Sequence, residues 1–92
     1  MPYSDKIREA VAKTPKSLGT QLGRWAIYHD FSVTRIAKTL GVTRQTVYNW
    51  FTGSEVFVGY RDRVEWLLKI LQSSPNADAA WSHVCKELNL EP

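Results

Sequence analysis

Residues 32–53 read SVTRIAKTLGVTRQTVYNWFTG, and this stretch predicts two short helices joined by a tight turn. Ser32 is a typical N-cap for a first helix over residues 33–40. Gly41 then ends that helix as a left-handed residue. Thr43 caps a second helix over residues 44–51.

The side chains around the turn have the sizes that a crossing of two helices requires. Ala37 is small where the second helix passes over the first, and Gly41 accepts the positive φ of a sharp reversal. A short turn of this kind, with a glycine in it, is typical of helix–turn–helix units. The apolar residues expected to hold the angle between the helices are Ile36, Leu40, Val42, Val47 and Trp50.

This pattern resembles the Cro/phage-repressor-like helix–turn–helix DNA-binding family. The resemblance rests on the spacing of Ala37, Gly41, Val47 and Trp50, on the W-x-x-G ending at 50–53, and on the LGTQL segment at 18–22. It spans about residues 18–71. The resemblance implies a lambda-repressor-like fold whose second motif helix enters the major groove of DNA.

Hydrophobic periodicity predicts an all-α chain of five or six short helices with a C-terminal helical extension. Outside the motif we expect helices over Asp5–Ala12 (capped by Ser4), Pro15 to about Tyr28, Tyr60–Leu71 and Ala77–Leu88, with a loop over Ser54–Gly59. Pro15 is expected as the first helical residue because proline suits that position. The predicted units are an N-terminal arm or short helix (1–14), the helix–turn–helix domain (15–72) and a C-terminal helix (73–92) for packing or dimerisation.

The first outward residues of the second motif helix match the chemistry of base edges in the major groove. Arg44 suits O6 and N7 of guanine, and Gln45 suits N6 and N7 of adenine. Thr46 suits the methyl group of thymine. These three residues are therefore predicted to read sequence.

Flanking positions of the same helix add further candidates. Thr43 offers a hydroxyl beside the amides of a helix N-terminus, which favour a phosphate. Tyr48 and Asn49 lie one turn further on, within reach of a base edge or the backbone. No acidic residue occurs from Ser32 to Thr52, whereas a merely solvated pair of helices usually mixes charge signs.

Phosphate contacts are expected from cations on neighbouring segments. Arg35 and Lys38 are predicted to point outward from the first motif helix, where the resemblance places the sugar–phosphate backbone. Arg61 is a further candidate, as are Arg24 and Arg63, although each also fits an ordinary solvated charge. Such contacts set affinity, and base contacts set sequence choice.

Two positions depart from the family pattern. Val33 stands where many members carry a glutamine that holds a phosphate. The loop after the second motif helix is Glu55-Val56-Phe57-Val58, where polar or basic residues are usual. This apolar loop fits either the core or a surface for self-association.

Composition limits the remaining possibilities. The chain of 92 residues has net charge +3, with eight basic and three acidic residues up to Gly53 and four basic and six acidic residues from Ser54 onward. A basic front half suits a polyanionic partner. The single Cys85 excludes an internal disulfide, and we expect it to pack on a helix. The start of the chain does not read as a signal peptide, and no apolar run is long enough to span a membrane, so a soluble cytoplasmic protein is expected.

These features predict a DNA-binding transcription regulator, most simply a repressor. We expect double-stranded DNA and a second copy of the chain as partners, and no cofactor, metal, small-molecule ligand or enzymatic activity. His29 is expected at a helix end, because neither it nor His83 has metal-ligand spacing. Two alternatives stay open: a DNA-packaging protein of the small-terminase kind that assembles as a ring, and an adaptor that binds only protein. For Trp66 and Ile70, internal packing against the C-terminal helix and a dimer interface are both open.

Overall fold

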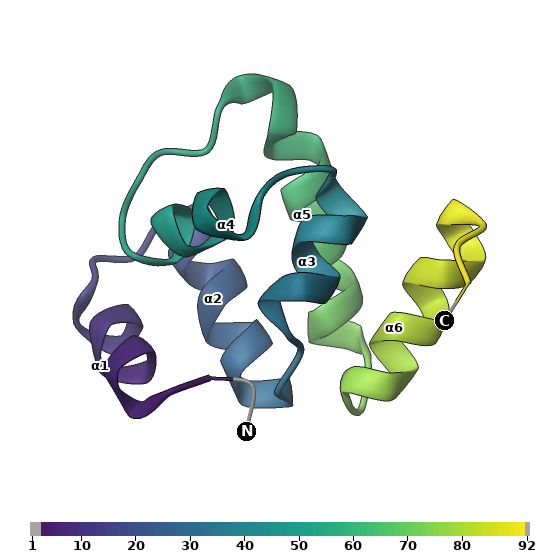
Figure 1. Cartoon of the computed structure of the whole chain (residues 1–92), viewed down its shortest axis with the longest axis horizontal. Helices are drawn as coiled ribbons and strands as arrows, with labels where there is room; N and C mark the ends of the chain where they lie inside the picture. Colours follow the sequence, from purple (N-terminus) through teal and green to yellow (C-terminus); the bar gives the residue numbers. More distant parts are fainter. Residues whose placement is uncertain (1–2, 92) are drawn as a thin grey trace.

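The computed structural model describes residues 3–91, which form six helices and no strand (Figure 1). The helices are α1 (Asp5–Lys13), α2 (Leu18–His29), α3 (Val33–Leu40), α4 (Arg44–Phe51), α5 (Val58–Ser73) and α6 (Ala77–Leu88). The prediction of an all-α chain with five or six short helices is confirmed.

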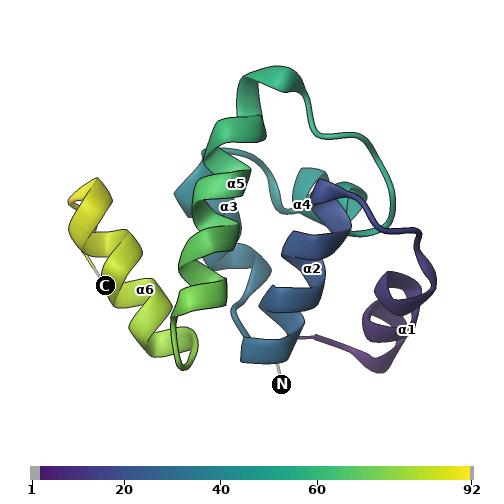
Figure 2. The same cartoon turned by 180° about the vertical axis from the view of Figure 1, so that it is seen from behind.

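Helix α2 lies at the centre of the molecule. It packs against α1, α4 and α5, while α3 contacts α4, α5 and α6. In the two opposite views α1 lies at one edge of the molecule and α6 at the other (Figures 1 and 2). Helix α6 therefore rests on α5 and α3, away from α1.

Local capping accounts for most helix boundaries. The side chains of Ser4, Ser32, Thr43 and Asn76 accept hydrogen bonds from backbone N–H groups in the first turns of α1, α3, α4 and α6. Each cap satisfies a donor that a helix start leaves unpaired. Gly41 ends α3 at a φ of 71°, in the left-handed conformation predicted for it.

Two helices differ most from the sequence-based prediction. Helix α2 begins at Leu18 and not at Pro15, because the Ser17 side chain accepts from the N–H of Thr20 and so caps the helix. Helix α5 runs from Val58 to Ser73 and is longer than predicted at both ends. The loop before it is correspondingly shorter.

The core contains two aromatic residues for which the sequence patterns gave no role. Phe31 is fully buried directly before the cap of α3, and its ring lies 6.2 Å from that of Trp81. Tyr3 is also buried, and its hydroxyl donates a hydrogen bond to the carbonyl oxygen of Phe31. Phe31 occupies the position before an N-cap where apolar residues often pack on their helix, so its burial has a recognisable local signal.

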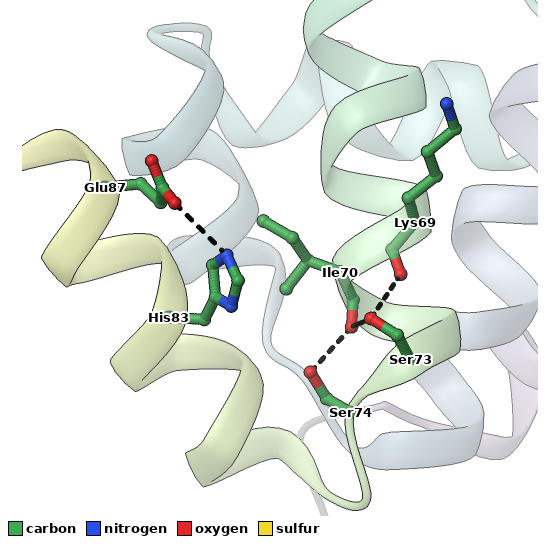
Figure 3. Close-up of polar contacts among 6 residues, drawn as sticks. All are labelled: Lys69, Ile70, Ser73, Ser74, His83 and Glu87. Carbon is green, nitrogen blue, oxygen red and sulfur yellow. Dashed lines mark hydrogen bonds and ion pairs between the residues drawn. The ribbon is translucent and has the colours of Figure 1, made fainter.

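Serine hydroxyls bind the last carbonyl groups of α5, just before the turn into α6 (Figure 3). Ser73 Oγ donates to the carbonyl of Lys69 at 2.9 Å and Ser74 Oγ to that of Ile70 at 2.6 Å, which satisfies carbonyls at the helix end. Ile70 is buried, so its internal packing is confirmed. Leu88, expected on the inward side of α6, is instead 42% exposed. Within residues 3–91 no helix combines the length and apolarity that crossing a membrane requires.

Candidate nucleic-acid interface

Helix α4 is divided into an inward and an outward face. Its inward residues Val47, Trp50 and Phe51 are buried. Its N-cap is Thr43, whose Oγ1 accepts from the N–H of Thr46 at 3.2 Å. Because these three side chains pack into the core, they fix the position of α4, and the opposite side of the helix faces solvent.

Helix α4 lies close against α2 because α2 carries two glycines on the contact face. A Cβ atom at Gly19 would lie 2.5 Å from the carbonyl oxygen of Trp50, and one at Gly23 would lie 2.9 Å from the Phe51 ring. Both distances are shorter than a carbon atom tolerates. The absence of a side chain at these two positions therefore permits the close approach of α4 to α2.

The outward face of α4 presents Arg44, Gln45 and Asn49, all exposed. Gln45 Nε2 donates to Asn49 Oδ1 at 2.9 Å across one helical turn. This amide pair leaves Gln45 Oε1 and the second Nε2 hydrogen available, and those are an acceptor and a donor of the kind that adenine N6 and N7 complement. Arg44 contributes a guanidinium at the N-terminal end of the same face.

The other predicted α4 residues are less accessible. Thr43 is exposed and Thr46 is half-buried, and their hydroxyl oxygens lie 3.0 Å apart. Tyr48 is half-buried, with its ring in an edge-on arrangement 6.4 Å from that of Phe51. Its ring therefore takes part in packing, and only part of the side chain is open to a ligand.

Two of the predicted phosphate contacts are exposed. Lys38 lies in the last turn of α3, at the edge of an open groove formed by α3, α5 and α6. Arg61 lies in the first turn of α5, beside the loop that follows α4. The two cations therefore lie on different helices.

Arg35 does not project freely from α3 as predicted. Its guanidinium carbon lies 5.2 Å from the centroid of the Trp81 ring, and its Nη1 lies 3.8 Å from Asp78 Oδ1. Both partners belong to α6. The sequence motif could not reveal this contact, because Trp81 is more than forty residues away along the chain.

The further arginine candidates also contact the protein. Arg24 Nη2 donates to the carbonyl of Thr14 at 3.0 Å, which ties α2 to the end of α1. The Arg63 guanidinium lies 5.4 Å from the centre of the Tyr60 ring and donates weakly to the carbonyl of Leu40 at 3.5 Å. These contacts give both arginines a structural role.

The two departures from the family pattern have different structural outcomes. Val33 is buried at 4% exposure, so the position where the family carries a polar clamp belongs here to the core. In the segment predicted as a loop, Val56 is buried, whereas Phe57 and Val58 are 80% and 81% exposed. Val58 is the first residue of α5. The apolar loop is therefore anchored by one residue and presents two others to solvent.

The two motif helices are themselves neutral to basic in composition. Helices α3 and α4 contain no acidic residue. Among the described residues, no group of three or more His, Cys, Asp or Glu side chains is placed to hold a metal ion. His29, the last residue of α2, has Nε2 at 2.8 Å from the carbonyl of Leu71, so Nε2 carries the proton. Cys85 is buried on α6, as predicted.

The chain was compared with models of known protein families, with curated proteins and with solved structures, and no match was found.

Proposed function

We propose that this chain is a sequence-specific double-stranded DNA-binding protein that regulates transcription, as a cytoplasmic homodimeric repressor. The observation that carries the proposal is the outward face of α4, where Arg44, Gln45 and Asn49 are exposed while the opposite face is buried. A rigid helix that presents guanidinium and amide groups suits the donor and acceptor pattern of the major groove. The absence of acidic residues from α3 and α4 favours approach to phosphate.

In this proposal the residues divide into two classes. Arg44 contacts a guanine and Gln45, oriented by Asn49, contacts an adenine, while Thr46 meets a thymine methyl group. Thr43, Tyr48, Lys38 and Arg61 contact the sugar–phosphate backbone. Bound at a promoter, such a protein represses by occupying the site, without catalysis or a cofactor.

The test begins with selection of bound sites from a random DNA pool, followed by titration of the selected duplex at several salt concentrations. We expect the logarithm of the affinity to fall linearly with the logarithm of the salt concentration, because phosphate neutralisation releases counterions. Arg44→Ala should weaken the preferred site by about 1–3 kcal/mol and relax choice at one base pair. Lys38→Ala should weaken all sequences alike and reduce the salt slope by about one.

Lys69→Ala is the matched control, because Lys69 is an exposed cation on α5 outside the proposed interface. It should change neither the preference nor the slope. If Arg44→Ala left both the affinity and the base preference of the protein intact, the assignment of α4 to the major groove would be wrong.

A protein-binding adaptor is the second candidate, favoured by the exposed Phe57 and Val58. The same titration separates the two functions. An adaptor would bind duplex DNA without a steep salt dependence or would not bind it.

A further inference from the structure

Arg35 rests on a fixed aromatic surface that α6 supplies. Trp81 is 8% exposed, and its ring also packs edge-on against that of Phe31, with the ring centroids 6.2 Å apart. The guanidinium carbon of Arg35 lies 5.2 Å from the centre of this ring. A cation over a tryptophan face is attracted by the ring quadrupole, so Trp81 restricts where the guanidinium can lie.

The contact with Trp81 uses none of the hydrogen-bond donors of Arg35. A guanidinium carries five N–H donors, and attraction of its charge to a ring face forms no hydrogen bond with an oxygen acceptor. Within residues 3–91 its side chain donates no hydrogen bond, and its one ionic contact is the 3.8 Å approach to Asp78. The Asp78 side chain is 94% exposed, and ion pairs with so exposed a member are weak.

We propose that Arg35 binds a phosphate of the DNA backbone and that Trp81 holds its guanidinium in position. In the free protein the Asp78 carboxylate pairs with this guanidinium, and the phosphate replaces the carboxylate when DNA binds. The proposal rests on the DNA-binding function proposed above. A phosphate accepts a bidentate pair of hydrogen bonds from an arginine fork, which the distant Asp78 carboxylate does not do. Helix α6 then sets the affinity for DNA without contacting a base, and its effect is the same on every sequence.

The first test is Asp78→Asn, which removes the competing charge and keeps the shape of the side chain. Helix α6 retains its cap, because Asn76 accepts from the N–H of Ala79 at 2.8 Å. We expect the variant to bind every duplex more tightly, by up to about fivefold, which corresponds to the loss of one exposed ion pair. Circular dichroism of each variant confirms that its helix content is unchanged.

A control is needed because any lost negative charge favours binding to DNA. Glu87→Gln removes the same charge from α6 at a position paired with His83 at 3.5 Å, nine residues beyond Asp78 (Figure 3). It should improve binding less than Asp78→Asn does. In an Arg35→Gln background, the gain from Asp78→Asn should shrink to the gain from Glu87→Gln, because a double-mutant cycle isolates the pairwise effect.

The result that overturns this inference is an Asp78→Asn gain that persists unchanged in the Arg35→Gln background, or one no larger than that of Glu87→Gln. In either case the wild-type protein would still bind DNA with its salt dependence, and the proposed function would stand. If the wild-type protein showed no salt-dependent binding to DNA, both the proposed function and this inference would be wrong.

Discussion

At the scale of single residues, Gly19 and Gly23 determine how closely the candidate recognition helix approaches α2. A side chain at Gly19 would meet the backbone oxygen of Trp50, which cannot rotate away. The position of α4 therefore depends on residue 19 having no Cβ atom. The positions of Arg44 and Gln45, which α4 carries, depend on it as well.

The residue-scale prediction is that Gly19→Ala destabilises the protein. Overpacking costs about 1–3 kcal/mol, whereas the higher helix propensity of alanine recovers about 1 kcal/mol. Because the clash is with a backbone atom, the cost lies at the upper end of that range, and we expect the free energy of unfolding, measured by urea denaturation, to fall by about 2 kcal/mol. Gly59→Ala is the control, because a Cβ at this α5 position meets nothing within 4 Å. Equal stability of the two variants would show that α4 can shift at no cost.

At the scale of elements, α1 and the segment before it are attached to α2 and Phe31 by a few polar contacts. Arg8 forms an ion pair with Asp30 at 3.4 Å, and the buried Tyr3 hydroxyl donates to the Phe31 carbonyl. Burial, with a smaller effect of nearby Tyr48, raises the pKa of Tyr3 well above its ordinary value of 10.0. Ionisation of Tyr3 therefore disfavours the attached arrangement.

This shift predicts a loss of stability in alkali. A group whose folded-state pKa is raised contributes its full stabilisation below its unfolded pKa and loses it as pH rises towards the folded value. From about pH 10 upward, the contribution of Tyr3 to the free energy of unfolding should fall by up to about 1.4 kcal/mol per pH unit. This contribution is measured as the difference in free energy of unfolding between wild type and Tyr3→Phe, from pH 8 to about pH 11.5. The wild type should lose its advantage as pH rises, and a constant difference between the two would contradict the prediction.

At the scale of the whole molecule, the size of one chain limits the length of DNA that it would cover in the proposed function. Its principal extents are 34 × 30 × 22 Å, so its longest dimension is comparable to one turn of duplex DNA, about 34 Å. A single recognition helix covers only part of a turn. Two copies related by a two-fold axis would cover two half-sites one turn apart.

The whole-molecule prediction concerns the number of copies. Light scattering of the protein with its selected duplex should give the mass of two chains per DNA site, because the proposed regulator binds as a homodimer. Free protein measured over a concentration series is the control for nonspecific association. An assembly of eight or more chains would instead support the ring-forming packaging protein, which also binds DNA.

The sequence alone determined the features that depend on residues within one helical turn. The caps at Ser32 and Thr43 and the reversal at Gly41 follow from such neighbours, and the structure has each as predicted. The predicted inward residues Val47 and Trp50 are also buried, together with Phe51, which was not predicted. Pro15 was placed wrongly because the nearby Ser17 competes for the same helix start. Exposure of Arg44, Gln45 and Asn49 also followed from the helical period.

Only the tertiary structure decided which distant helix covers each face. Arg35 looks like a free surface cation in its own segment, yet α6 returns across α3 and places Trp81 beneath it. Tyr3 is likewise buried because the distant residues Phe31 and Phe51 come to lie beside it. The physical reason is that caps and periodicity act between residues a few positions apart, whereas burial depends on how the whole chain closes on its core.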